Sequence, residues 1–72
     1  MIVIEDIIML DDTIYTQEKL YEPNKLMPYQ TFIVVGFRGV KKTHVSCRFD
    51  PMVDVTIEDK ELVRKKCVAL LK

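Results

Sequence analysis

The sequence predicts an α+β fold: a small antiparallel β-sheet of about four strands, arranged as two hairpins, with one C-terminal helix packed on it. Three observations lead to this prediction. Residues 2–10 are rich in Ile and Val, residues 31–49 have the pattern of a β-hairpin, and residues 57–71 follow a marked helix start. Because 72 residues suffice for one small core, we expect residues 1–72 to form a single domain.

The N-terminal part predicts the first hairpin. Its β-branched run favours a strand over a helix, and Asp11-Asp12 suits a turn. Residues 13–16 alternate and predict a second strand, while residues 17–22 fit either an extension of that strand or a helical turn. Prolines within residues 23–28 then predict a loop, because each proline also restricts the residue before it.

The second hairpin has Gly39 near its tip. A three-residue loop of Phe37, Arg38 and Gly39 puts the glycine where such loops need a left-handed residue. The resulting register predicts one face with Ile33, Val35, Thr43, Val45 and Cys47, and an opposite face with Phe32, Val34, Lys42, His44, Ser46 and Arg48. A loop of two or four residues would mix these faces, so we prefer three. Residues 31–35 then form a central strand that is apolar on both sides.

The C-terminal helix has a defined start. Thr56 suits the N-cap, and Asp59 stands three residues later, in the position of a capping box. Apolar residues at helical spacing form a stripe that is expected to face the sheet. The predicted core consists of Ile33, Val35, Val45, Cys47, Phe49, Val63, Cys67, Leu70 and Leu71, and Ile2, Ile4 and Ile8 are expected to contribute from the first strand.

Composition limits the classes of function. No apolar stretch reaches membrane-spanning length, because Glu5 and Asp6 interrupt the N-terminal run, and no signal peptide is recognisable, so we expect a cytoplasmic protein without membrane contact. The two cysteines, Cys47 and Cys67, lack the spacing of a metal site, and we expect no metal and no cofactor. A disulfide between them stays open if strand and helix pack together, although two buried thiols are the preferred interpretation.

The sequence gives little support to catalysis. His44 precedes Cys47 by three residues, and this odd spacing places the two on opposite faces of a strand. A cysteine nucleophile and its histidine base need hydrogen-bond contact. No helix starts beside Gly36 and Gly39, so they do not form a phosphate-binding loop. We therefore expect a protein that is not an enzyme.

Charge is unevenly distributed along the chain. Residues 1–30 carry a net charge of −4 and residues 31–72 a net charge of +4. Basic residues of the second hairpin, with Phe32 and Phe37 nearby, make nucleic-acid binding one alternative. The order of elements also resembles that of small SH3-like barrels capped by a C-terminal helix, some of which bind nucleic acid. The sequence pI near 6.5 argues against this alternative.

Binding of a protein partner is the function that the sequence favours most. The predicted contact residues are Phe37, Arg38, Lys41, Lys42, His44 and Arg48, with a second contact at Leu26, Met27 and Tyr29. An aromatic residue beside an arginine is typical of interface anchors. The chain would then act as a regulator, inhibitor or subunit of a larger partner, as compact accessory proteins of phages and mobile elements do. Its small core predicts a homo-oligomer, and a small-ligand-sequestering oligomer is a further alternative.

Overall fold

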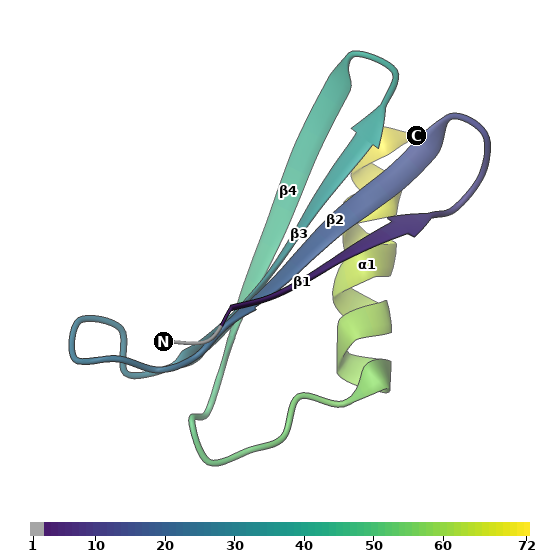
Figure 1. Cartoon of the computed structure of the whole chain (residues 1–72). Helices are drawn as coiled ribbons and strands as arrows, with labels where there is room; N and C mark the ends of the chain where they lie inside the picture. Colours follow the sequence, from purple (N-terminus) through teal and green to yellow (C-terminus); the bar gives the residue numbers. More distant parts are fainter. Residues whose placement is uncertain (1–2) are drawn as a thin grey trace.

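The computed structural model describes residues 3–72 and confirms the α+β fold, with Ile2 of the predicted first strand outside the described residues. Its elements are strands β1 (Val3–Met9), β2 (Ile14–Tyr21), β3 (Gln30–Arg38) and β4 (Lys41–Phe49), followed by helix α1 (Ile57–Leu71). The strands pair antiparallel in the order β1-β2-β3-β4, so each strand lies beside its neighbour in the chain (Figure 1).

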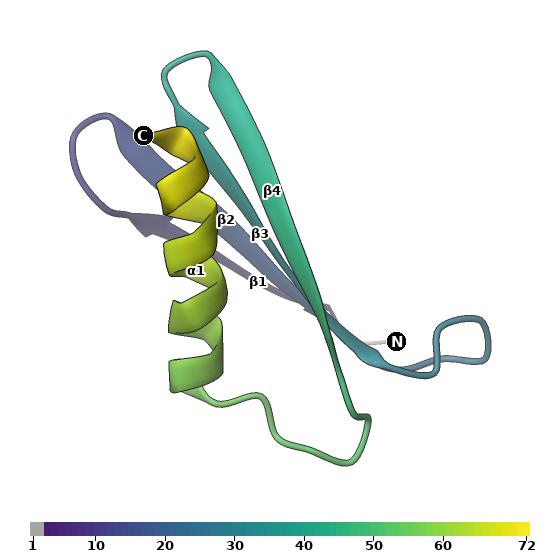
Figure 2. The ribbon, with the colours of Figure 1, turned by 180° about the vertical axis from the view of Figure 1, so that it is seen from behind.

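The sheet is an open layer with β1 and β4 at its edges, and it does not close into an SH3-like barrel. Helix α1 packs against one face only, over β3 and β4. Figure 2 shows the helix in front of the sheet, and Figure 1 shows it behind. The opposite face carries no second layer from the residues that the structure describes. This asymmetry decides which side chains are core and which are available to a partner.

The β1–β2 hairpin turns at the predicted acidic doublet. The carboxylate of Asp11 accepts hydrogen bonds from the backbone N–H groups of Thr13 (2.7 Å) and Ile14 (2.8 Å). These bonds hold the pKa of Asp11 below its ordinary value because they favour the charged form. The sequence left residues 17–22 undecided, and the structure shows strand up to Tyr21.

The β3–β4 hairpin corrects the predicted register. Arg38 pairs with Lys41 across a two-residue loop of Gly39 and Val40, so the three-residue loop is wrong. Gly39 has φ +59°, whereas Val40 has no positive φ, which is the residue pattern of a type II′ turn. The observed pairing is shifted by three residues from the predicted one, and an odd shift exchanges the two faces of the strand: Val34 pairs with Val45, whereas the prediction paired Ile33 with Thr43.

The core lies between α1 and the sheet, and it differs from prediction because of this shift. The buried apolar side chains are Ile14, Phe32, Val34, Val63, Cys67 and Leu71. Four partly buried side chains pack against the cluster of Phe32, Val34, Val63 and Cys67: Leu20, Val45, Cys47 and Phe49. Ile33 and Val35 are half-buried on the other face, so their assignment to the core is wrong. Close helix packing uses Gly36, where a Cβ atom would stand 2.8 Å from Leu71 Cδ1.

Helix α1 begins as predicted and buries Val63, Cys67 and Leu71 of the predicted stripe, but not Leu70. Both bonds of the capping box form: the Asp59 N–H donates to Thr56 Oγ1, and the Thr56 N–H donates to Asp59 Oδ2, each at 3.1 Å. Leu71 is buried, but Leu70 is 57% exposed and does not belong to the core. At the C-terminal end, Arg38 Nη1 donates to the Leu71 carbonyl oxygen (3.3 Å), which satisfies a helix-end acceptor.

One buried ion pair fastens the helix to β2. Glu18 is 2% exposed, and it accepts from Arg64 Nε (2.5 Å) and Nη2 (3.0 Å). Thr16 Oγ1 also donates to Glu18 (3.3 Å), so this buried carboxylate has three donors. The contact with Glu18 is the main reason that the pKa of Arg64 is raised. The buried charge of Glu18 is thereby compensated.

Two further expectations concern the membrane and the cysteines. No helix among residues 3–72 is long and apolar enough to cross a membrane. Cys67 is buried, Cys47 is half-buried, and both are free thiols. Burial raises the pKa of the Cys67 thiol, so it stays protonated.

Candidate functional site

The sheet surface opposite α1, which we call the open face, is a candidate binding surface. Alternation along the strands assigns its members, and the pairing aligns them in rows. Its described side chains are Glu5, Ile7, Met9, Tyr15, Gln17, Lys19, Tyr21, Thr31, Ile33, Val35, Phe37, Lys42, His44, Ser46 and Arg48.

An aromatic cluster stands at the hairpin end of the open face. Tyr15 and Phe37 are paired across β2 and β3, and their rings stack with centroids 4.8 Å apart and planes 12° apart. Lys42, paired with Phe37 on β4, holds its ammonium 5.7 Å from the Phe37 ring centroid. Phe37 therefore has an aromatic ring on one face and a cation on the other, the favourable geometries for both contacts.

An apolar strip continues along β3 from this cluster. Val35 and Ile33 follow Phe37 on the open face, and all three are half-buried although no helix covers them. Their burial comes from the neighbouring strands, because cross-strand side chains stand within contact distance. The strip is thus an apolar surface at the centre of the sheet rather than at an edge.

The charge on this part of the open face is of one sign. Lys42, His44 and Arg48 line the strip along β4, and Lys19 stands beside Ile33 on β2. Glu18 is the sole acid of β2, β3 and β4, and its side chain is buried toward α1. The three strands therefore present an apolar strip with basic borders and no acidic side chain.

Strand β1, at the edge of the open face, carries an acidic residue and two exposed apolar residues. Glu5 forms an ion pair with Lys19 (Oε2 to Nζ, 3.8 Å) and accepts a hydrogen bond from Gln17. Ile7 and Met9 are 70% and 68% exposed, which leaves two large apolar side chains on an edge strand. Exposed apolar edges of this kind are sites of pairing with another chain.

A shallow cavity of about 190 Å³ lies at the Ile33 end of the strip, away from Phe37. Tyr21, Thr31 and Ile33 contribute the sheet side. The β2–β3 loop contributes Met27 and Tyr29, which are 40% and 47% exposed. Two of the three residues of the predicted second contact thus border the same surface as Phe37.

The structure divides the predicted contact residues between two faces. Phe37, Lys42, His44 and Arg48 share the open face. Arg38 and Lys41 pair with each other one position further along, and Arg38 reaches the end of α1 instead. Phe32, expected beside the basic residues, is buried beneath α1. Leu26 is 90% exposed and does not line the cavity.

Sequence reasoning missed four members of the site: Tyr15, Lys19, Ile33 and Val35. The last two were assigned to the core by the wrong register, and Tyr15 was not connected to the second hairpin. The signal that would have found Ile33 and Val35 is Gly39, since a glycine at the first position of a two-residue loop gives the observed pairing of β3 and β4.

The described residues hold no Cys–His pair on one face of β4. His44 is exposed on the open face, and Cys47 points to the opposite face, as the spacing predicts. Among residues 3–72 no group of three or more His, Cys, Asp or Glu side chains is placed to hold a metal ion. Comparison with protein-family models, with curated proteins and with solved structures finds no match for this chain.

Proposed function

We propose that the protein is a non-catalytic module that binds another protein and acts as a regulator, inhibitor or subunit of that larger partner. Its contact surface is the part of the open face formed by β2, β3 and β4. The observation that carries the proposal is the apolar strip of Ile33, Val35 and Phe37, uncovered by α1 and bordered by bases without an acid. Protein interfaces combine such an apolar centre with a polar, charged border.

The geometry of Phe37 favours a protein over a nucleic acid. Binding of single strands relies on bases that stack on aromatic faces. Tyr15 and Lys42 already occupy the two faces of the Phe37 ring, so a base has no face on which to stack without displacing one of them. The net charge of zero also differs from the strongly basic character of small nucleic-acid-binding domains.

The positive charge of the open face indicates the chemistry of the partner. An acidic protein segment with apolar side chains would place its carboxylates at Lys42 and Arg48 and its apolar groups on the strip. Complementary charge raises the association rate, and an aromatic anchor supplies affinity. Phe37→Ala is therefore expected to weaken binding more than Lys42→Ala does.

A comparison of variants in pull-down from native lysate tests the proposal. The bait is the full chain, the lysate is treated or not with nuclease, and bound proteins are identified by mass spectrometry. The double variant Lys42→Glu/Arg48→Glu reverses the open-face charge, and Lys66→Glu, exposed on α1, is the matched control. An acidic protein that is retained after nuclease, kept by the control and lost with the double variant is the expected result.

Recovery of nucleic acid alone would contradict the proposal and support the alternative. Salt dependence then gives an independent check. Three permanent cations on the strip's borders, Lys19, Lys42 and Arg48, predict a slope of log affinity against log salt of roughly −3 if they neutralise phosphates. A protein interface anchored by Phe37 is expected to lose much less affinity.

We further propose that the chain self-associates through β1. The supporting observation is the exposure of Ile7 and Met9 on an edge strand. Pairing along this edge leaves β3 and β4 available to the protein partner. Light scattering across a wide concentration range is expected to give more than 8.5 kDa, and Ile7→Lys/Met9→Lys is expected to return the mass to that of one chain.

A further inference from the structure

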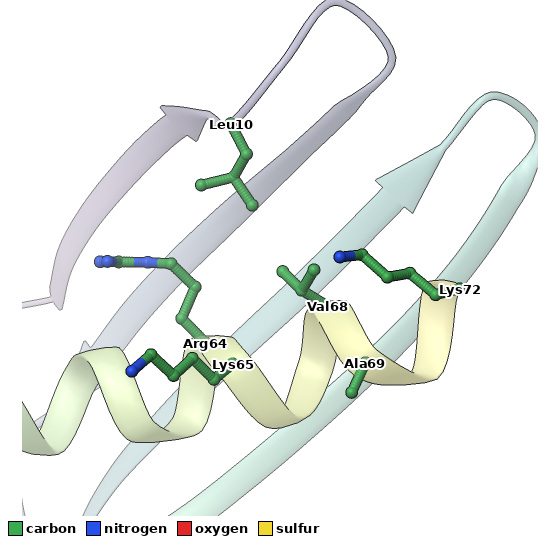
Figure 3. A pocket seen from close by; sticks show the side chains of 6 residues that line it. All are labelled: Leu10, Arg64, Lys65, Val68, Ala69 and Lys72. Carbon is green, nitrogen blue, oxygen red and sulfur yellow. The ribbon is translucent and has the colours of Figure 1, made fainter.

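A second cavity lies on the helix side of the sheet, away from the open face. It measures about 340 Å³ and arises because α1 packs over β3 and β4, leaving space beside the end of β1. Its lining residues are Leu10, Arg64, Lys65, Val68, Ala69 and Lys72. Figure 3 shows Val68 between the three basic side chains, with Leu10 facing them from the β1 end.

The lining combines an apolar floor with three bases and no acid. Leu10, Val68 and Ala69 provide the apolar surface. Arg64 is already paired with Glu18, and Glu61 and Asp6 also raise its pKa, so Arg64 adds no free positive charge to the cavity. Its Nη1 nitrogen makes no hydrogen bond to the described residues, which leaves donors held in place by the ion pair.

The uncompensated positive charge comes from the two lysines. Lys65 and Lys72 have no ion-pair partner within 4.0 Å among residues 3–72. In Figure 3 both side chains extend in the same direction as Arg64, on either side of Val68. The cavity therefore places positive charge at its border and apolar contact at its floor.

We propose that this cavity binds a small anionic molecule with an apolar body. The apolar body lies on Leu10, Val68 and Ala69, and the anionic group faces the basic border of the cavity, which Arg64, Lys65 and Lys72 form. The volume is at the lower end of the range for small-molecule sites, which are mostly apolar with a few orienting polar groups. This site is separate from the open face and does not depend on the proposed protein-binding function.

Octanoate is a suitable probe, with octanol and acetate as matched comparisons. Octanol keeps the apolar body without the charge, and acetate keeps the charge without the body. Methyl NMR spectra of the full chain follow Leu10, Val68 and Ala69 during titration. We expect saturable shifts of these methyl groups with octanoate, and binding at least fivefold weaker with octanol and with acetate.

Two variants test the assignment of groups. Lys65→Gln/Lys72→Gln keeps the exposed helix surface polar and is expected to weaken octanoate binding about two- to fivefold for each lysine. Val68→Trp fills the floor and is expected to abolish binding. Lys66→Gln, which does not line the cavity, is the control and is expected to bind as the unmodified chain does.

The proposal is overturned by any of three results: octanol binds as tightly as octanoate, the shifts lie elsewhere in the molecule, or the double lysine variant binds as tightly as the Lys66→Gln control. Because the lysines are exposed, their variants are expected to stay folded, so the test does not depend on Val68→Trp. Failure here leaves the open-face proposal unaffected, since the pull-down uses other residues.

Discussion

The two faces of the sheet differ in how far their side chains are buried and in whether their charged groups have partners. Phe32 and Phe37 lie five positions apart in β3, yet Phe32 is 2% exposed beneath α1 and Phe37 stands on the open face. On the covered face the polar groups have partners within the fold, as Glu18 has in Arg64. On the open face the bases of β4 form no ion pair with the described residues. The covering helix, rather than the strand sequence, separates the core from the open face.

The largest expected difference between the faces concerns these two phenylalanines. Phe32→Ala removes a buried ring and is expected to lower the free energy of unfolding by about 3–5 kcal/mol. Phe37→Ala loses mainly its stacking on Tyr15 and is expected to cost about 1 kcal/mol. Urea denaturation of both variants at one protein concentration measures this. Equal costs would mean that something covers the open face in solution.

The next effect concerns the buried ion pair. Arg64→Ala leaves the Glu18 carboxylate buried with Thr16 as its remaining side-chain donor, so the free energy of unfolding is expected to fall by about 3 kcal/mol. Glu18→Met/Arg64→Met replaces both charges by apolar side chains and is expected to recover most of that loss. Denaturation near neutral pH compares the two. A double variant as unstable as Arg64→Ala would contradict this account.

A smaller effect is expected where the helix approaches β3. Gly36→Ala would place a Cβ 2.8 Å from Leu71 Cδ1 and 3.0 Å from Cys67 Sγ, and both neighbours are buried. Overpacking of this kind costs about 1–3 kcal/mol. Ser46→Ala, on the open face of the neighbouring strand, serves as the control and is expected to be nearly neutral in thermal denaturation.

The smallest expected effect on stability comes from the Asp11 carboxylate in the β1–β2 turn. The pKa of Asp11 is lowered in the folded chain by the N–H groups of Thr13 and Ile14. Its contribution to stability is therefore present above the unfolded pKa and is lost in the acid range, as pH falls through the lowered pKa of the folded chain. Amide NMR shifts of Thr13 and Ile14 are expected to titrate in this range. Asp11→Asn should remove that titration, and Asp12→Asn should retain it.

The fold class was predictable because its signals are local. Thr56 and Asp59 form both bonds of the capping box that their spacing predicts, and the acidic doublet forms the first turn. The register of β3 and β4 could not be predicted in the same way. Residues 32–35 are apolar on both faces, so hydrophobicity does not decide which face of the strand points to the core. Loop geometry decided instead, through Gly39.

The site was predictable only in part for the same reason. Lys42, His44 and Arg48 alternate strictly, so their common face follows from the sequence alone. The strip beside them depends on which face α1 covers, and that depends on long-range packing. Glu18 illustrates the point: the sequence left residues 17–22 undecided between a strand and a helical turn, and Arg64, 46 residues later, is what makes burial of this carboxylate tolerable.

The order of the sheet also has a consequence for folding kinetics. Every strand pairs with the strand next to it in the chain, and α1 packs on the two strands that precede it. Contacts between segments that are near in sequence need little loop closure, so such a topology has a low contact order for a protein with so much sheet. The β3–β4 hairpin and α1 can therefore assemble first, with β2 and then β1 adding outward. The chain can thus reach its native state quickly without a long-range pairing as the slow step.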